Sequence, residues 1–262
     1  MAEQIFSLTN VSFSYPGNIP ALAGISLAIN KGERAAIIGA NGTGKSTMLA
    51  MLDALIFPQQ GAVRFMGKEL SPENMNGAAF QREFRKKVGF VFQNPDIQLF
   101  CPSVREDILF GPLQLGIPRD EILQRFDRTV ELLKLTPLLE RSPHNLSLGE
   151  KKKIAIASVL VIEPDVLLLD EPTAGLDPQT MRDIIAVLQH AHHAGKTVVF
   201  ATHDLHIVEE IADTIHVFGN SRSVIRSGTP EEILSDREFL QKNNLAHIHV
   251  HRHLHASHVH EH

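Results

Sequence analysis

The chain has 262 residues, of which 43% are hydrophobic and 21% charged, and a formal net charge of −5. This length suits one large domain, or one domain with an inserted subdomain, and the composition allows a sizeable core. The negative charge argues against a general nucleic-acid binder, which usually presents a basic face. The single cysteine, Cys101, permits no internal disulfide and fits a reducing compartment. The sequence shows no signal peptide and no run of about 18 apolar residues, so we expect no membrane-spanning helix.

The N-terminal region predicts two half-buried strands. Apolar and polar residues alternate over residues 5–15 and 25–29, and Pro16-Gly17-Asn18 between them is typical of a turn. Tyr15, the single tyrosine of the chain, stands just before that turn. Its position suits a core residue and an exposed platform for a stacked purine ring equally well.

A phosphate-binding loop follows the next strand. Residues 39–47 match the pattern G-x-x-x-x-G-K-[ST], after a short apolar strand at residues 35–38 and before apolar residues at helical spacing. Glycines let the backbone approach a ligand, so that successive N–H groups surround phosphate oxygens. Lys45 can reach the β- and γ-phosphates, and the Ser46 hydroxyl can bind Mg²⁺. The nucleotide-binding residues predicted here are Gly39, Ala40, Asn41, Gly42, Thr43, Gly44, Lys45, Ser46 and Thr47.

The middle of the chain changes from strand to helix. A strand at residues 62–65, a short basic helix near residues 80–87 and a buried strand at residues 88–92 are predicted. The last strand ends at Gln93, and Asn94-Pro95-Asp96 is predicted to be a loop. Helical patterns at residues 104–110 and 119–135 then predict a helical subdomain inserted at about residues 94–162.

The second half alternates strands and helices. The apolar run Val166–Leu169, which ends in Asp170 and Glu171, is typical of a central parallel strand. Further strands are predicted at residues 197–201, 214–218 and 223–227, and helices at residues 178–193, 205–212, 231–234 and 238–242. This order indicates an α/β fold with a largely parallel sheet.

Polar residues stand at the ends of several predicted parallel strands. Ligands of open parallel sheets bind at the carboxyl ends of the strands, so these residues should converge near the phosphate loop. Asp170 can hold Mg²⁺ through water beside Ser46, and Glu171 can orient or deprotonate an attacking water. Gln93 can complete the Mg²⁺ shell or sense the γ-phosphate. His203 can hydrogen-bond the γ-phosphate or the water.

A second candidate phosphate site begins at Ser147. Ser147 is suited to cap a helix, and Glu150, three residues later, completes a capping box. A capped helix start with small residues, here including Gly149, can also bind an anion. The sequence favours neither reading over the other.

Together with Gly175-Leu176-Asp177, these motifs resemble the ATPase subunit of an ABC transporter over about residues 5–234. The resemblance implies a P-loop NTPase core with a mixed, largely parallel sheet, an N-terminal antiparallel β-subdomain and an inserted helical subdomain, all within residues 1–245. It also implies ATP and Mg²⁺ as cofactors and a head-to-tail dimer with two ATP molecules at the interface. In such a dimer Tyr15 would stack on adenine, Ser147 and Gly149 would contact the γ-phosphate across the interface, and Asp177 would belong to the cross-dimer loop.

The second phosphate site departs from the family pattern. Leu148 and Glu150 stand where the family usually has Gly and Gln, and Glu150 adds a negative charge near the expected phosphate. Lys151, Lys152 and Lys153 can offset that charge, and we expect all three on the helix surface.

A narrower resemblance lies in residues 91–100 and 106–112, which look like the ATPases of energy-coupling-factor importers for vitamins, cobalt or nickel. In that family the surface after Gln93 receives a coupling helix from the membrane subunit. The apolar Ile97, Leu99 and Phe100 would suit such a groove. The alternative is that they pack into the core of the helical subdomain.

The C-terminal tail, residues 246–262, is rich in histidine. Imidazole suits Ni²⁺, Co²⁺, Cu²⁺ and Zn²⁺, and alternate residues of an extended chain share a face. The tail resembles histidine-rich ends of cobalt and nickel importer subunits, whereas an expression tag is the alternative. The candidate transition-metal ligands are His247, His249, His251, His253 and His255.

The sequence therefore predicts an ATPase that powers nickel or cobalt import from the cytoplasmic face of a membrane. Its expected partners are a second ATPase subunit, most simply an identical chain, and integral membrane subunits, with no nucleic acid. The alternatives are the ATPase of a vitamin importer of the same type, a soluble ABC-type ATPase, and a metal-storage or metal-delivery protein.

Overall fold

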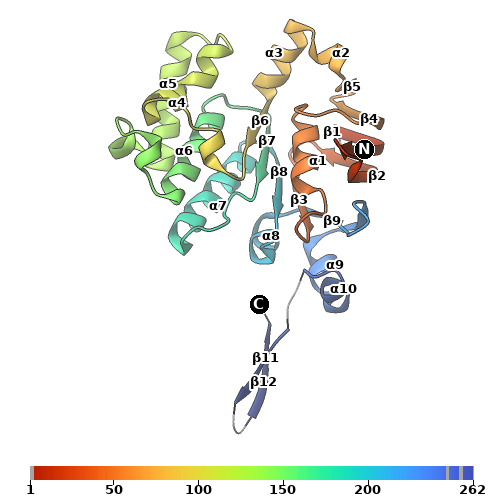
Figure 1. Ribbon diagram of the computed structural model, residues 1–262. Helices are drawn as coiled ribbons and strands as arrows, with labels where there is room; N and C mark the ends of the chain where they lie inside the picture. The colour runs from red at the N-terminus through yellow and green to blue at the C-terminus, as the bar shows by residue number, and fades with distance from the viewer. Residues whose placement is uncertain (1–2, 246–247, 254–255, 262) are drawn as a thin grey trace.

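The computed structural model describes residues 3–245, 248–253 and 256–261 (Figure 1). Within these residues, six strands form the central sheet in the order β10-β9-β3-β8-β7-β6. Five of them run parallel, and β10 pairs antiparallel with β9 at one edge. The strands are β3 (Arg34–Gly39), β6 (Val88–Val91), β7 (Val166–Asp170), β8 (Thr197–Thr202), β9 (Thr214–Phe218) and β10 (Val224–Gly228).

The N-terminal strands form a separate antiparallel sheet in the order β2-β1-β4-β5. They are β1 (Gln4–Tyr15), β2 (Ile19–Asn30), β4 (Gln60–Phe65) and β5 (Lys68–Glu69). The bounds of β1 agree with the predicted residues 5–15 to within one residue, whereas β2 begins six residues before the predicted 25–29. Register shifts let the ladder between the two strands continue past irregular positions such as Asn10.

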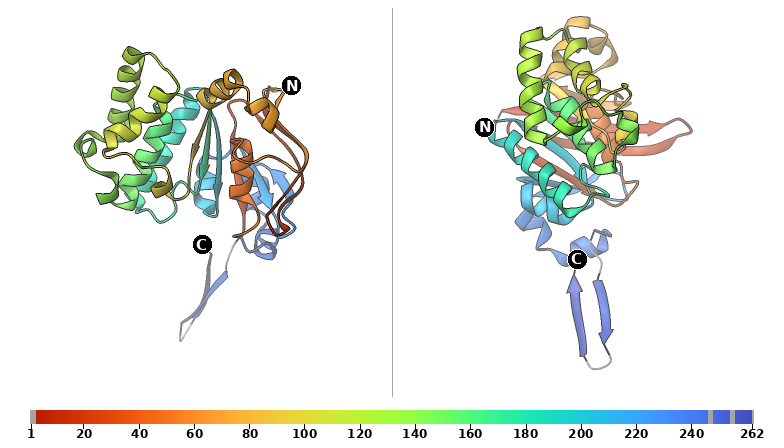
Figure 2. Two further views of the ribbon diagram at one scale, coloured as in Figure 1. Left: turned by 45° about the horizontal axis from the view of Figure 1, so that its top comes forward. Right: turned by 90° about the vertical axis from the view of Figure 1, so that its left-hand side faces the viewer.

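The helices divide into two groups on either side of the central sheet (Figures 1 and 2). Helix α1 lies between the central and the antiparallel sheets, whereas α4, α5 and α6 gather beyond the β6 edge. The helices are α1 (Lys45–Leu52), α2 (Pro72–Met75), α3 (Ala78–Lys87), α4 (Val104–Gln114), α5 (Arg119–Leu133), α6 (Leu148–Leu160), α7 (Pro178–His193), α8 (Leu205–Ile211), α9 (Pro230–Leu234) and α10 (Arg237–Lys242), with short 3₁₀ turns η1 (Pro95–Ile97), η2 (Thr136–Leu138) and η3 (Pro143–Asn145).

Each face of the central sheet is covered, which explains why its strands are apolar without alternation. Leu167 and Leu169 of β7 point into the core made with the helices from α4 to α8. Val166 and Leu168 of the same strand point into the core shared with α1 and the antiparallel sheet. A strand buried on both faces has no position for a polar residue until it ends, so the first polar residues mark its carboxyl end.

The structure adds detail to two local expectations. Residues 94–96 lie in the predicted loop after β6, where Asn94 Oδ1 accepts a hydrogen bond from Asp96 N (3.0 Å) and caps the short 3₁₀ turn η1. The tail contains two paired strands, β11 (Ile248–His253) and β12 (Ala256–Glu261), where only an extended segment was predicted. No helix in the part of the chain described here has the length and apolar character that crossing a bilayer requires.

Candidate nucleotide site

The phosphate loop joins β3 to α1, as the sequence predicted. Gly42 and Gly44 have φ of 81° and 105°, a region that side chains rarely adopt. A Cβ on Gly44 would lie 2.3 Å from the carbonyl oxygen of Ala21, so only glycine fits there. Lys45 Nζ curls over the loop and donates to the carbonyl oxygens of Gly39 (2.8 Å) and Ala40 (3.3 Å). The ammonium group of Lys45 therefore lies against the carbonyl oxygens at the start of the loop.

Two acids follow at the end of β7. Asp170 is buried, and its Oδ1 has no hydrogen-bond partner among the described residues. Burial raises the pKa of Asp170, and a hydrogen bond with Ser46 opposes that rise only in part. A buried carboxylate oxygen without a partner, beside a serine hydroxyl, offers the oxygen ligands that Mg²⁺ prefers. These residues fit a magnesium ion.

Glu171 is held by β8 and the residue that follows it. Its N–H donates to the carbonyl oxygen of Ala201 (2.9 Å), and its φ of 47° turns the chain sharply away from β7. Its Oε1 lies 2.9 Å from Nδ1 of His203, and its Oε2 accepts a hydrogen bond from Thr202 Oγ1 (3.3 Å). The carboxylate is thus buried and fixed in direction at the edge of the sheet.

Most of the predicted nucleotide-binding residues line one pocket of about 530 Å³. Tyr15 stands at its rim with 42% of its surface exposed, and its hydroxyl lies 3.2 Å from Thr47 Oγ1. Tyr15 is therefore not a core residue, and its role as a platform for a purine ring stays a prediction. The predicted residues that line the pocket are Tyr15, Asn41, Gly42, Gly44, Lys45, Ser46, Thr47, Gln93 and Glu171.

The other predicted loop residues do not line this pocket. Thr43 is buried, and its hydroxyl donates to the carbonyl oxygen of Ala40 (2.8 Å), which braces the loop from inside. A Cβ on Gly39 would lie 2.7 Å from the carbonyl oxygen of Phe218, so Gly39 lets the loop pass close to β9. His203 joins the site through its contact with Glu171.

Ser147 and Gly149 lie elsewhere, in a separate hollow of about 340 Å³ that also includes Asp177. Here the capping box is confirmed. Ser147 Oγ accepts from Glu150 N (3.3 Å), and Glu150 Oε2 accepts from Ser147 N (2.8 Å). These hydrogen bonds with Ser147 lower the pKa of Glu150 and keep its carboxylate charged over the helix start. Within one chain, the two candidate phosphate sites are not brought together.

Sequence reasoning missed four residues that line the nucleotide pocket, of which three, Ile19, Pro20 and Ala21, stand at the start of β2. The one charged residue among the four is Arg222. It belongs to the turn between β9 and β10 and lines the pocket together with Tyr15 and Gly42. Its φ of 59° is unusual for a residue with a side chain. Its carbonyl oxygen accepts from Ala23 N (2.9 Å), which fixes the turn against β2. The local sequence indicates only a polar turn and carries no signal for a ligand.

One lysine was placed wrongly by the sequence. Lys152 was expected on the surface of α6, but it is only 1% exposed. Lys151 and Lys153 do lie toward the outside, where they pair with Asp96 (2.7 Å) and Asp183 (2.5 Å). The apolar stripe of α6 includes Ala155, Ile156 and Val159, and position 152 falls on the same stripe by helical spacing.

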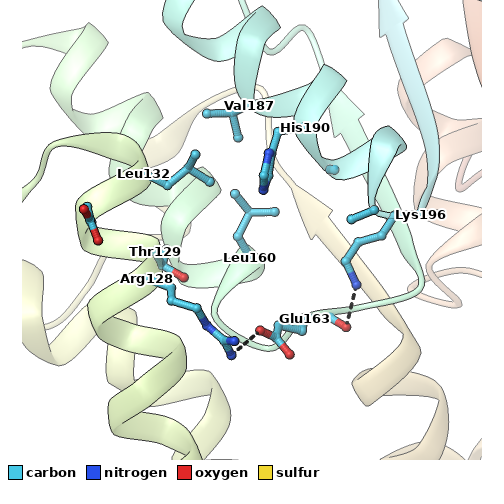
Figure 3. Close-up of a pocket in the computed structure, with 11 residues that line it drawn as sticks. Arg128, Thr129, Leu132, Leu160, Glu163, Val187, His190 and Lys196 are labelled. Atoms are coloured by element: carbon cyan, nitrogen blue, oxygen red, sulfur yellow. Dashed lines mark hydrogen bonds and ion pairs between the residues drawn. The ribbon is translucent and has the colours of Figure 1, made fainter.

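A further hollow of about 630 Å³ lies between α5, α6 and α7 (Figure 3). Its floor is apolar, and its rim carries the Arg128–Glu163 ion pair (2.8 Å) and a hydrogen bond from Lys196 Nζ to the carbonyl oxygen of Glu163 (3.1 Å). None of the predicted site residues line it. Volume alone therefore does not identify the site.

The histidine tail is described only in part. In the β11–β12 pair, His249 stands opposite His260 and His251 opposite His258. His253 stands opposite Ala256, whereas His247 and His255 lie outside the described residues. Among the described residues, no three His, Cys, Asp or Glu side chains converge as a metal site would require.

Comparisons with known proteins agree with this geometry. Residues 22–174 match the family model described as ABC transporter. The chain is 46% identical to the nickel import ATP-binding protein NikO of Rhodobacter capsulatus, over 92% of this chain and 95% of that protein. It is 42% identical to the energy-coupling factor transporter ATP-binding protein EcfA of Methanothermobacter thermautotrophicus, over 92% of this chain and 76% of that protein.

Two solved structures share the fold. One is cbiO1 from Clostridium perfringens, part of the ABC transporter complex cbiONQ, with a TM-score of 0.78 and 37% identity over 93% of this chain and 95% of that one. The other is the ATP-binding cassette MJ0796, a dimer bound to ADP and phosphate, with a TM-score of 0.77 and 28% identity over 86% of this chain and 98% of that one. The cofactors of such cassettes are ATP and Mg²⁺. The chain belongs to the ABC transporter family, as an ATP-hydrolysing subunit of the energy-coupling type.

Proposed function

We propose that this chain powers the import of a transition metal ion, nickel or cobalt, through an energy-coupling-factor type membrane transporter. The observation that carries the ATPase role is the meeting of Lys45, Ser46, Gln93 and Glu171 in one pocket. Support for the metal comes from the similarity to NikO, which is named for nickel import, along nearly the whole length of both chains. The alternative cargo is a vitamin carried by a transporter of the same type.

Different residues at the site would bind the metal ion, bind the phosphates and activate water. When bound, Mg²⁺ neutralises charge that develops on the phosphate oxygens. Ser46, Gln93 and Asp170 would hold that ion, and Lys45 would leave its two carbonyl contacts to bind the phosphates. Glu171 would orient a water molecule and take its proton, with the carboxylate held in place by β8.

A complete site needs a second copy of the chain. Ser147 and Gly149 line a hollow separate from the nucleotide pocket, so in one chain they do not reach a nucleotide on Lys45. A head-to-tail arrangement would place the start of α6 of one copy against the phosphate loop of the other. This supports a homodimer that closes on two ATP molecules.

An exposed apolar surface could receive the membrane subunit. We define the docking patch as Ile97, Phe100, Phe110 and Leu113, which come from η1, the segment after it and α4. Ile97 and Phe100 are 64% and 61% exposed, and the rings of Phe100 and Phe110 pack edge to face at 4.9 Å. Leu99, predicted for the same surface, is instead buried in the core at 2% exposure. Such a patch supports peripheral attachment at the cytoplasmic face of a membrane.

We assign the histidine tail an accessory role. The predicted ligands of the tail would bind Ni²⁺ or Co²⁺ through imidazole nitrogen. Deletion of residues 246–262 tests this role, because uptake by the membrane complex should continue without them. Loss of all uptake after the deletion would place the tail on the transport route.

Uptake measurements test the cargo. Cells that carry this gene with its genomic neighbours should accumulate radioactive nickel or cobalt, and Glu171→Gln should remove that accumulation. Vitamin uptake by the same cells, with no accumulation of either metal, would favour the alternative. Unchanged ATP hydrolysis in Glu171→Gln would contradict the catalytic assignment itself.

A further inference from the structure

Lys152 is a buried cation in the helix that begins at the second phosphate site. It lies on α6, five positions after the cap residue Ser147, and its side chain turns inward while Lys151 and Lys153 turn outward. Its Nζ donates a hydrogen bond to the carbonyl oxygen of Glu171 (2.9 Å). A side chain of α6 therefore reaches the main chain of the residue that would activate water.

A lysine is a costly choice for this position. Burial lowers the pKa of Lys152 to about 8, although the nearby carboxylates of Asp170 and Glu171 raise it. A leucine or methionine would fill an apolar helix stripe without removing an ammonium group from water. The polar group is therefore better explained by what it contacts than by packing.

The contact falls at a strained point of the backbone. Glu171 has a φ of 47°, in the left-handed region that residues with a side chain rarely adopt. Its N–H is fixed by Ala201 and its carbonyl oxygen by Lys152, with a longer bond from Ala174 N (3.4 Å). These hydrogen bonds fix the main chain from which the Glu171 side chain starts, whereas Thr202 and His203 contact the carboxylate itself.

We propose that Lys152 is a positioning residue, which transmits the placement of the α6 start to the carboxylate of Glu171 through their side-chain to main-chain hydrogen bond. The proposal rests on the proposed role of Glu171 in hydrolysis. A phosphate at Ser147 would fix α6, and α6 would then fix Glu171 of the same chain. On the preceding residue of the helix, the ion pair of Lys151 with Asp96 extends this connection to η1, which contributes Ile97 to the docking patch.

Three variants of Lys152 test this role. Lys152→Met keeps the length of the side chain and removes the donor, so kcat for ATP hydrolysis should fall by about tenfold to a hundredfold. The dissociation constant for ATP should change less than about twofold, because Lys152 does not line the nucleotide pocket. Lys152→Gln and Lys152→Arg keep a donor and should recover part of the lost rate.

Lys196→Met is a matched control. Lys196 also donates from Nζ to a main-chain carbonyl oxygen, that of Glu163, and burial also lowers its pKa (Figure 3). It lies away from the nucleotide pocket, so this substitution should leave kcat within about twofold of the parent. An equal fall of kcat in both variants would indicate a general loss of packing and would overturn the proposal.

A double variant separates this proposal from the role of Glu171. In a Glu171→Gln background, Lys152→Met should cause no further loss, because Lys152 acts through Glu171. The positioning role would be overturned if Lys152→Met lowered kcat in the Glu171→Gln background as much as it does in the parent. It would also be overturned if Lys152→Met alone had the kcat of the parent. Retained hydrolysis in Glu171→Gln would instead overturn the proposed function. If Lys152→Met fails to fold, a partly reduced kcat with an unchanged dissociation constant for ATP in the folded Gln and Arg variants supports the role, and parental kcat in both variants contradicts it.

Discussion

Nδ1 of His203 lies 2.9 Å from Oε1 of Glu171, although the two side chains come from neighbouring strands and differ in exposure. Glu171 is buried, whereas 62% of the His203 side chain is open to solvent. An exposed imidazole thus holds a buried carboxylate at the mouth of the nucleotide pocket. Since β7 and β8 are adjacent and parallel, their ends bring the two residues together.

His203→Ala should lower kcat by about tenfold to a hundredfold, because Glu171 would lose one of the groups that fix its carboxylate. His203→Gln should recover part of the rate, since its amide can still donate to Oε1. Steady-state release of phosphate measures both. A change in the affinity for ATP without a change in kcat would contradict this role and place His203 among the binding residues.

Arg222→Gly should have two opposite effects. Glycine accepts a φ of 59° without strain, so the free energy of unfolding should rise by about 0.5–1 kcal/mol. The loss of a cation from the pocket should weaken ATP binding by about threefold to tenfold, and the binding of adenosine much less. Calorimetric titration with ATP and with adenosine, together with denaturant unfolding, measures these effects.

Lys134→Gly is the control for that experiment. Lys134 is also a cation at a left-handed position, with a φ of 57° at the end of α5, and it does not line the nucleotide pocket. The Lys134→Gly substitution should raise the free energy of unfolding and leave the affinity for ATP unchanged. Equal losses of ATP and adenosine affinity in Arg222→Gly would show that the guanidinium contacts the base and not the phosphates.

The sequence predicted the features that depend on local pattern. The phosphate loop, the acids at the end of β7 and the apolar central strands follow from residue type and spacing over a few positions. The burial of Lys152 was missed because three consecutive lysines look solvated as a group. A comparison of the three positions with the spacing of the apolar residues of α6 would have predicted that Lys152 is buried.

Other features depend on contacts between distant segments. Leu99 and Phe100 are neighbours of similar hydrophobicity, yet one is buried and the other is exposed. Asp107 Oδ1 accepts from the N–H of Phe100 (3.1 Å) and of Cys101 (3.0 Å), which sets the direction of this segment. Arg222 enters the nucleotide pocket only because the β9–β10 turn rests on β2. No local pattern contains such relationships.

Phe100→Ser should separate attachment from hydrolysis. The substitution removes a large exposed ring from the docking patch, so the chain should no longer co-purify with its membrane subunits. Hydrolysis by the isolated chain should stay within about twofold of the parent, because Phe100 does not line the nucleotide pocket. Leu123→Ser, at an exposed apolar position of α5, is the control and should keep attachment. Unchanged co-purification of Phe100→Ser would contradict the docking patch.

His216 should make the stability of the fold depend on pH. It is buried in β9, its Nδ1 lies 2.8 Å from Ser227 Oγ, and its Nε2 has no hydrogen-bond partner among the described residues. Burial lowers the pKa of His216 below its usual 6.5, although the charge of Glu33 opposes this. The unfolded chain therefore takes up a proton near pH 6.5, whereas the folded chain does so only at lower pH.

It follows that the contribution of His216 to stability is complete above about pH 6.5 and declines as the pH falls below it, by at most about 1.4 kcal/mol per pH unit. His216→Asn can keep the bond to Ser227 and cannot titrate. The difference in unfolding free energy between parent and variant should stay constant from pH 7 to 8. Below pH 6.5 the parent should lose stability relative to the variant. His206→Asn, at an exposed position of α8, controls for the removal of an imidazole. A parent and a His216→Asn variant that lose stability in parallel on acidification would show that other groups govern the acid limit.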